Sequence, residues 1–568
     1  MRRTRRHTEA LVLAVFALLV LVGCGRGPSI APGSTLVLTL EGEYAEGADA
    51  PLIARFLGAG EQSLLGLYSA FRKAELDPRI ARVVVRVRGL GIGWGKAQEL
   101  RAAITRVNAA GKETVAVLET EGFGAGGYYV ASAAKRVVAT PASRSPLLGL
   151  AAEHLFFAGT FEKLGVMVEY ERAGDYKSAV EPFTAQKMSA ASREMSNALL
   201  DSTEAAFASD VAAARALEPA AVRALVDEAP SSAQELLDAK LVDEIAYYED
   251  VVKDAPIVEQ EDWAAVDVSS LGIETQATFA LISGAGMVVT GKGEISASGT
   301  RVMAADTFVA AVHEAVEDAE VKALLVRIDS PGGSPLASDL MWRALRDARA
   351  AGKPVVVSMS DVAASGGYYV ASAADTIVSH PTTLTGSIGV FVIRPSLGGL
   401  LEKVGVTVET MQRGARADLL FGSQPLTAGA REVLRKDVEG VYEQFVARVA
   451  EGRALDPDAV KKVGGGRVWT GAQALEIGLV DELGGLYEAA VAAKKAVGIA
   501  ADAPVSLKSF PAQKTLAQQI GELLFGARVQ SASPLEALPR ELRDLHTLVT
   551  ALPVGAPLLV PPSVVVLH

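Results

Sequence analysis

GGYYVASAA occupies residues 126–134 and recurs unchanged at residues 366–374, 240 positions later. The same spacing aligns EKLGV at 162–166 with EKVGV at 402–406, and a spacing of 238 aligns LVDE at 241–244 with LVDE at 479–482. Solenoid and propeller repeats are far shorter than this, so each copy is expected to be a whole domain with its own core. The sequence therefore predicts a tandem duplication of one domain.

Short β-branched runs alternate with alanine-rich stretches in both copies. The runs are residues 82–87 and 114–118 in the first copy, and residues 323–328 and 354–359 in the second. Their apolar character is continuous, as in strands that are covered on both faces. The stretches between them have helical composition, for example residues 97–108 and 337–351. This alternation predicts an α/β fold for each copy.

Composition excludes several classes of function. The chain has 568 residues, 55 basic and 67 acidic side chains and a net charge of −12. An acidic balance argues against a nucleic-acid partner, because neutralising phosphates needs a basic face. A single cysteine excludes a disulfide framework within the chain and any multi-cysteine metal site. Neither an H-E-x-x-H helix nor a G-x-S-x-G elbow occurs, so we expect no metal and no cofactor.

The two ends differ in character from the repeat. Four arginines precede an apolar run at residues 10–22, which is shorter than the roughly 20 residues that span a bilayer. The run ends in LVGC at residues 21–24, so we interpret residues 1–23 as a lipoprotein signal peptide and Cys24 as the lipidated residue. The alternative is a short membrane anchor, and both place the bulk of the chain outside the cytoplasm.

These observations define the expected domain boundaries. Residues 24–34 are rich in Gly, Pro and Ser and are expected to form a flexible tether. The first domain is assigned to residues 35–275 and the second to residues 276–504. Residues 505–568 are expected to form an apolar, proline-rich C-terminal tail.

Reactive residues that occur in only one copy are candidates for chemistry. Ser365 lies at a strand-to-helix turn where the first copy has Ala125. A hydroxyl there can be exposed beside backbone N–H groups of the starting helix, which is the position of a nucleophile. The alternative is that Ser365 caps the helix.

Two further positions differ in the same way. Lys177 belongs to the first copy and falls opposite Ala417. A lone lysine is usually a solvated surface charge, so this alternative stays open. Ser387 belongs to the second copy and is replaced by Leu147 in the first.

Five motifs carry a resemblance to a known family. They are DSPGGS (329–334), ASGGYYVAS (364–372), TGSIGVF (385–391), YKSAVEPF (176–183) and VWTGAQAL (468–475). Residues 35–498 resemble the long, duplicated form of the signal peptide peptidase A (SppA) family, bacterial serine proteases with a Ser–Lys dyad. The resemblance implies a ClpP/crotonase-like fold in both copies. It also implies a homo-oligomer, a tetramer by resemblance.

The resemblance also implies roles for individual residues. Ser365 would be the nucleophile, Lys177 the general base and Ser387 the residue that orients the lysine. The backbone amide of Gly366 would bind the oxyanion, with Gly332 or Gly333 nearby. Lys177 must then be buried, because a lysine in water has a pKa near 10.4 and is protonated at neutral pH. The carboxylates of Asp175 and Glu181 are expected to point away from its amine.

The resulting functional hypothesis is a membrane-associated serine endopeptidase that degrades cleaved signal peptides and similar hydrophobic peptides. The expected location is the bacterial cell envelope, with the lipid on Cys24 in the membrane and the protein facing the periplasm. The alternative is a catalytically silent peptide-binding or scaffold lipoprotein of the same fold. Among the histidines, His380 is the strongest competitor for the role of base. An acyl-CoA enzyme of the crotonase type fits poorly with a place outside the cytoplasm.

Overall fold

The fold is known from a computed structural model that describes residues 30–46, 62–122, 125–145, 147–293 and 301–511. The signal peptide, Cys24 and residues 25–29 of the predicted tether lie outside these residues, as does the C-terminal tail beyond residue 511. The remaining tether residues are not flexible throughout, because Ile30 is buried and Ser34 begins a strand. None of the helices in the described ranges combines the length and the apolar character that a membrane crossing needs.

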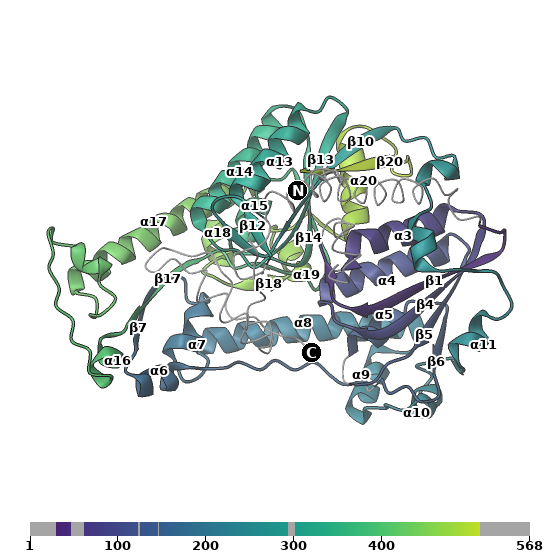
Figure 1. Cartoon of the computed structure of the whole chain (residues 1–568), viewed down its shortest axis with the longest axis horizontal. Helices are drawn as coiled ribbons and strands as arrows, with labels where there is room; N and C mark the ends of the chain where they lie inside the picture. The colour runs from purple at the N-terminus through teal and green to yellow at the C-terminus, as the bar shows by residue number, and fades with distance from the viewer. Residues whose placement is uncertain (1–29, 47–61, 123–124, 146, 294–300, 512–568) are drawn as a thin grey trace, which may run out of the picture.

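The first copy folds around a parallel sheet with the strand order β8-β6-β5-β4-β1-β9. Its central strands are apolar and buried, as expected for strands covered on both faces. Figure 1 shows this sheet with α3 and α4 beside it. The strands are β1 (Ser34–Gly42), β4 (Ile80–Leu90), β5 (Glu113–Leu118), β6 (Arg136–Ala139), β8 (Glu244–Ile245) and β9 (Ile257–Val258), and the helices are α3 (Leu64–Leu76), α4 (Trp94–Ala109) and α5 (Ala125–Ala131).

The second copy repeats this arrangement. Its parallel strands follow the order β19-β15-β14-β13-β10-β20, so each has a counterpart in the first sheet. These strands are β10 (Ala277–Ala285), β13 (Val321–Ser330), β14 (Val355–Ala364), β15 (Thr376–Ser379), β19 (Glu482–Leu483) and β20 (Val505–Phe510), and the helices are α13 (Ala305–Glu317), α14 (Pro335–Ala350) and α15 (Gly366–Ala371). The shared order confirms the predicted duplication and the α/β class.

One predicted boundary is wrong. The composition assigns residues 505–510 to the tail, but they form β20, which pairs in parallel with β10. β20 occupies the place that β9 has in the first sheet, so the second sheet needs this edge strand to match its copy. Because proline-rich sequence follows this strand, composition alone does not separate the strand from the tail. The second domain therefore extends at least to Phe510.

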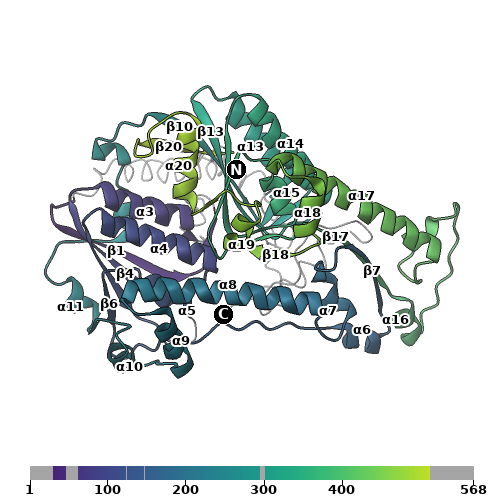
Figure 2. The same ribbon diagram turned by 180° about the vertical axis from the view of Figure 1, so that it is seen from behind.

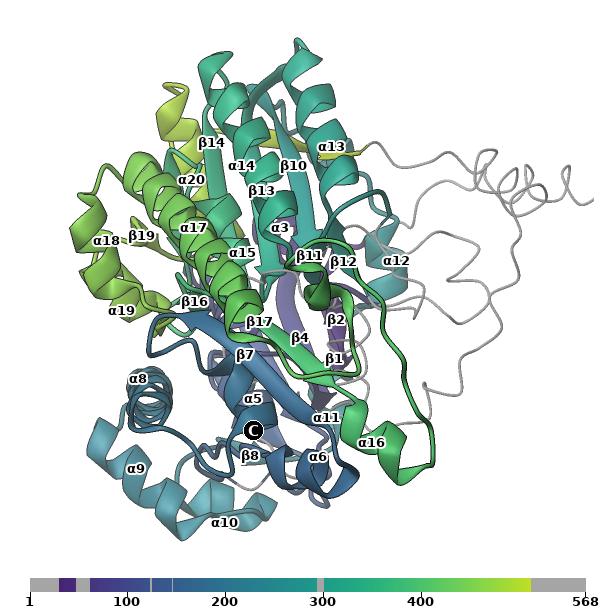
Figure 3. The same ribbon diagram turned by 90° about the vertical axis from the view of Figure 1, so that its left-hand side faces the viewer.

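Strands and helices from the two copies also pack on each other. β7 (Met167–Ala173) of the first copy pairs antiparallel with β17 (Val390–Ser396) of the second. Helix α8 (Ala190–Arg215) runs below both halves in Figure 2, and its Met195 and Leu199 pack against Val468 of β18 (Val468–Thr470). In Figure 3 the strands of the second sheet stand above those of the first, with β7 and β17 side by side. Because β7 leads directly to Lys177, this pairing fixes where the lysine lies.

A buried charge cluster joins the two copies. The guanidinium of Arg327 on β13 binds Glu46 at 3.1 Å and Glu99 of α4 at 2.6 Å, and all three side chains are buried. Burial raises the pKa of Glu99, but the charge of Arg327, the contact with His380 and the N–H of Leu486 together outweigh burial and hold the pKa below its usual value. Breaking such a pair would leave a buried charge without compensation, so the cluster favours one relative placement of the two sheets.

Candidate active site

Ser365 stands between the last residue of β14 and the first residue of α15. Its backbone has φ 53° and ψ −114°, a conformation that non-glycine residues rarely adopt. Its N–H donates to the carbonyl of Gly386 at 2.8 Å, which holds this turn in place. Although Ser365 occupies the N-cap position of α15, its hydroxyl makes no capping hydrogen bond. The helix-cap alternative is therefore wrong, because the strained turn directs the hydroxyl elsewhere.

The hydroxyl of Ser365 faces the amine of Lys177. Lys177 Nζ lies 2.8 Å from Ser365 Oγ, and both side chains have no exposed surface. The loop that carries Lys177 is held by close backbone contact: a Cβ on Gly174 would lie 2.2 Å from the backbone of Gly465, and a Cβ on Gly466 would lie 2.4 Å from the N of Lys177. The surface-charge alternative for Lys177 is therefore wrong.

Ser387 completes the contacts of the amine. Lys177 Nζ lies 3.0 Å from both the hydroxyl and the carbonyl oxygen of Ser387. Ser387 also has a positive φ of 53°, and its N–H donates to the carbonyl of Arg467 at 2.7 Å. The structure thus brings together all three residues that distinguish the two copies.

The electrostatics of this cluster follow from burial. Desolvation lowers the pKa of Lys177 well below 10.5, because burial disfavours the charged form of the amine. Glu181 is directed to other partners: it lies 3.5 Å from Arg172 and accepts a hydrogen bond from the N–H of Ser189. Asp175 is exposed. Both carboxylates are therefore directed away from the amine of Lys177, as expected.

The glycines that the resemblance indicated lie beside Ser365. A Cβ on Gly366 would lie 3.0 Å from the amide N of Gly333 and 3.1 Å from the Cα of Gly332. The N–H of Gly332 donates to Ser330 Oγ, and its carbonyl accepts from the N–H of Val288 at 2.8 Å. Gly366 is the first residue of α15, where helical N–H groups have no partner within the helix. The backbone of Gly366, the residue after Ser365, thus lies close to the backbone of Gly332 and Gly333.

His380 belongs to another part of the molecule. Its Nε2 lies 3.6 Å from Glu99 in the charge cluster between the copies, whereas the hydroxyl of Ser365 meets Lys177. In the described ranges, His, Cys, Asp and Glu side chains form no group that could hold a metal ion. The hydroxyl of Ser365 therefore lies against the amine of Lys177 and not against the imidazole of His380.

A second charge cluster lies near this site and was not predicted from the sequence. Lys96 at the start of α4 lies 2.6 Å from Asp329 and 3.2 Å from Asp361, which belong to the strands that lead to Gly332 and Ser365. Asp361 also accepts from the backbone N–H of Lys96 at 2.9 Å. A signal was present, because the first copy has glycine at 89 where the second has Asp329. The cluster ties the active-site strands to the first domain.

The fold and this geometry define the class, a serine hydrolase, and comparisons with known proteins identify the family. This chain matches peptidase family S49 twice, at residues 107–260 and at residues 347–500. The chloroplastic serine protease SPPA of Arabidopsis thaliana is 35% identical over 84% of this chain and 71% of its own length. Protease 4 of Salmonella typhi is 32% identical over 85% of this chain and 82% of its own length. The chain belongs to peptidase family S49, as a serine peptidase of the SppA type in its two-domain form.

Two solved structures are similar to part of the chain. A mutant of ClpP1 from Listeria monocytogenes covers 36% of this chain and 91% of its own, with 13% identity and a TM-score of 0.23. A mutant of the 1510-N membrane-bound stomatin-specific protease covers 42% of this chain and all of its own, with 14% identity and a TM-score of 0.26.

Proposed function

We propose that this peptidase works through a Ser–Lys dyad that is shared between its two domains. Ser365 of the second domain would be the nucleophile and Lys177 of the first domain the general base. The observation that carries this proposal is the 2.8 Å contact between Lys177 Nζ and Ser365 Oγ, with both groups fully buried. A serine hydroxyl is a weak nucleophile, and a neutral amine within hydrogen-bond reach can accept its proton.

The reaction follows from this arrangement. Ser365 Oγ attacks the peptide carbonyl while Lys177 takes its proton, and the lysine then returns the proton to the leaving amine. The N–H groups of Gly366 and Gly333, with Gly332 shaping the turn, would bind the oxyanion. Ser387 would hold the amine in place through its hydroxyl and carbonyl. Water then removes the acyl group by the reverse path, so no cofactor is required.

Activity is expected to rise with pH and then level off. Below its pKa in the folded protein, Lys177 is protonated and cannot accept the proton of Ser365; above it, the base is available. Because burial lowers that pKa well below 10.5, the midpoint should also fall well below 10.5. The measurement is kcat between about pH 5 and pH 10.

Ser387→Ala provides a second profile for comparison. Its hydroxyl accepts a hydrogen bond that favours the charged amine, so its loss should move the midpoint to lower pH. A profile that is flat in both proteins would contradict the role of Lys177 as the titrating base.

We further propose hydrophobic peptides, including cleaved signal peptides, as substrates. Apolar side chains that follow Lys177 and Ser387 in the chain form a buried cluster, which consists of Ala179, Val180, Phe183, Phe391 and Ile393. A fluorogenic peptide with leucine and phenylalanine beside the scissile bond is expected to give kcat/KM at least about 10-fold higher than a peptide with serine at those positions. Equal values for the two peptides would contradict a hydrophobic preference.

We also propose that a lipid on Cys24 anchors the protein to a membrane of the bacterial envelope, with both domains facing the periplasm, where it assembles as a homo-oligomer. Cys24→Ser is expected to move the protein from the membrane fraction to the soluble fraction while kcat on a soluble peptide is unchanged. Fractionation of cells that express each form measures this. A Cys24→Ser protein that stays with the membrane would instead favour an uncleaved anchor.

A further inference from the structure

Strand β14 carries a β-bulge shortly before it reaches the nucleophile. The pairing of β13 with β14 shifts its register at Asp329, which alone faces residues 360–362. In the first sheet, the paired residues of β4 and β5 end at Val87 and Leu118, before the equivalent position. A bulge bends its strand and changes the direction in which the following side chains point. Ser365 follows directly after this bent stretch, so the bulge affects where its hydroxyl points.

Three charged side chains meet at the bulge. The amine of Lys96, from the first domain, lies 2.6 Å from Asp329 and 3.2 Å from Asp361. Lys96 is buried, and the two aspartates are partly buried. The second carboxylate oxygen of Asp329 accepts a hydrogen bond from the N–H of Val362 at 3.2 Å. These three side chains, here called the Lys96 cluster, therefore connect the bulged backbone to the first domain.

The start of α4 is fitted closely to the bulge. Asp361 accepts hydrogen bonds from the N–H of Gly93 at 3.2 Å and from the N–H of Lys96 at 2.9 Å. It therefore caps a helix of the other domain, whose own N-cap residue, Gly93, has no side chain to do so. A Cβ on Gly93 would overlap the carboxylate of Asp361, and a Cβ on Gly95 would lie 2.7 Å from the carbonyl oxygen of Ser360.

The charges of the Lys96 cluster are divided between the two copies in the same way as the dyad. Lys96 corresponds to Leu336 in the second copy, and Asp329 corresponds to Gly89 in the first. The lysine thus occurs only in the copy that supplies the proposed base, and Asp329 only in the copy that supplies the proposed nucleophile. This division is expected for a contact that is made once in each chain, beside its one active site.

The electrostatics of the Lys96 cluster depend on all of its members. Burial lowers the pKa of Lys96, but the charges of Asp329, Asp361 and Glu46 and the hydrogen bond to Asp329 together outweigh burial and raise the pKa. The amine is therefore charged at neutral pH. Burial raises the pKa of Asp329, and the charge of Lys96 opposes that rise. Loss of Lys96 would leave two neighbouring carboxylates without the cation that they share, which is costly in a buried site.

We propose that Lys96 is a positioning residue for the proposed Ser–Lys dyad. From the first domain it fixes the bulge that precedes Ser365, and so it holds the turn that presents the hydroxyl to Lys177. A rare backbone conformation such as that of Ser365 persists only where the surrounding structure enforces it. Because Asp329 stands three residues before Gly332, the same contact also places the glycines beside the nucleophile. The inference rests on the proposed function, since it assigns Lys96 a part in presenting that nucleophile.

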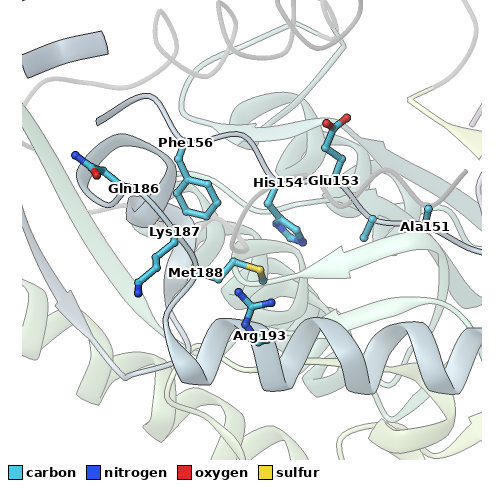
Figure 4. Close-up of a pocket in the computed structure, with 9 residues that line it drawn as sticks. Ala151, Glu153, His154, Phe156, Gln186, Lys187, Met188 and Arg193 are labelled. Carbon is cyan, nitrogen blue, oxygen red and sulfur yellow. The ribbon is translucent and has the colours of Figure 1, made fainter. Parts of the chain in front are cut away.

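The Lys96 cluster is separate from the cavity that Figure 4 shows. This cavity has a volume of about 630 Å³ and is lined by first-domain residues within the ranges 151–156 and 186–193. None of the lining residues belongs to the Lys96 cluster or to the dyad. A substitution of Lys96 therefore leaves the lining of this cavity unchanged.

Lys96→Met tests the inference on the full chain. Methionine has nearly the same shape but leaves the carboxylates without a cation. On a hydrophobic fluorogenic peptide, kcat per folded molecule is expected to fall at least about 10-fold, because a small displacement of a nucleophile slows its attack. KM should stay within about 2-fold of its original value. Circular dichroism measures the folded fraction.

Lys112→Met is the matched control. Lys112 is another buried lysine of the first domain, and it donates to the carbonyls of Asp77 and Ile80, within that domain. Its substitution also removes a buried amine, but it should keep the kcat of the unaltered protein. Comparison of the two variants separates a role in positioning from a general loss of stability.

Asp329→Asn tests the same contact from the second domain. Asparagine keeps the shape of the side chain and an oxygen that can accept from Val362, so this test does not depend on the folding of Lys96→Met. Loss of the charge should lower kcat at least about 3-fold. Lys96→Met combined with Asp329→Asn should have a kcat no lower than that of Lys96→Met alone, because both changes remove one contact.

The possible outcomes distinguish this inference from the proposed dyad. Unchanged kcat in Lys96→Met, equal losses in Lys96→Met and Lys112→Met, or single effects that multiply in the double variant would each overturn the inference and leave the dyad standing. Full activity of Ser365→Ala would overturn the dyad and, with it, the positioning role of Lys96.

Discussion

Ser365→Ala is expected to lower kcat by at least about 10⁴-fold on a hydrophobic peptide, with little change in KM. The substitution removes the attacking oxygen and leaves the amine of Lys177 without the proton it would accept. The first copy has alanine at the corresponding position, so the substitution introduces a residue that the other copy carries. Steady-state kinetics with active-site titration measures the effect, and mass spectrometry should detect an acyl-enzyme in the unaltered protein only.

A matched control is available at the opposite end of α15. Ser372 is equally buried, and its hydroxyl donates to the carbonyl of Tyr369 at 2.7 Å. Ser372→Ala also removes a buried serine hydroxyl, but it should retain the kcat of the unaltered protein. If Ser365→Ala and Ser372→Ala were equally active, Ser365 would not be the nucleophile.

Lys177→Met is expected to reduce kcat by a similar factor and also to change how stability depends on pH. Methionine has nearly the same shape but cannot accept a proton, so the attack of Ser365 loses its base. The pKa of Lys177 is lowered in the folded protein, so between that value and about 10.4 the unfolded chain binds a proton that the folded chain does not. The free energy of unfolding should therefore rise with pH across this interval, and Lys177→Met should lack this rise.

Denaturant unfolding at several pH values, together with kcat, tests both parts. Lys73→Met is the control, since Lys73 is also buried and donates to the carbonyls of Trp263 and Val266, outside the active site. It should keep the kcat of the unaltered protein. A Lys177→Met enzyme with normal kcat, or with the unaltered pH dependence of stability, would contradict a neutral, buried lysine.

Much of the fold could be predicted because both copies of the domain carry the same local sequence patterns. The β-branched runs and the alanine-rich stretches produce strands and helices wherever they occur, and two copies with one pattern must share one topology. The exception is β20, whose alternation of apolar and polar residues covers only residues 505–508 and which pairs with the edge that β10 offers. An edge strand of this kind depends on its neighbour more than on its own residues.

The candidate site could be predicted in part for a similar reason. Comparison of the copies singled out Ser365, Lys177 and Ser387, and the structure brings these three together. The same comparison did not reveal that Lys96 meets Asp329 and Asp361, since nothing local indicates that these charges from different domains are neighbours.

By itself, the sequence determined the duplicated α/β architecture and which residues are chemically distinctive, because propensity and apolar pattern act over a few neighbouring residues. Only the tertiary structure decided that a lysine and a serine 188 positions apart share one hydrogen bond, and that the amine has no exposed surface. The lowered pKa of Lys177 arises from desolvation, and desolvation is a property of the packing around a group rather than of the group itself.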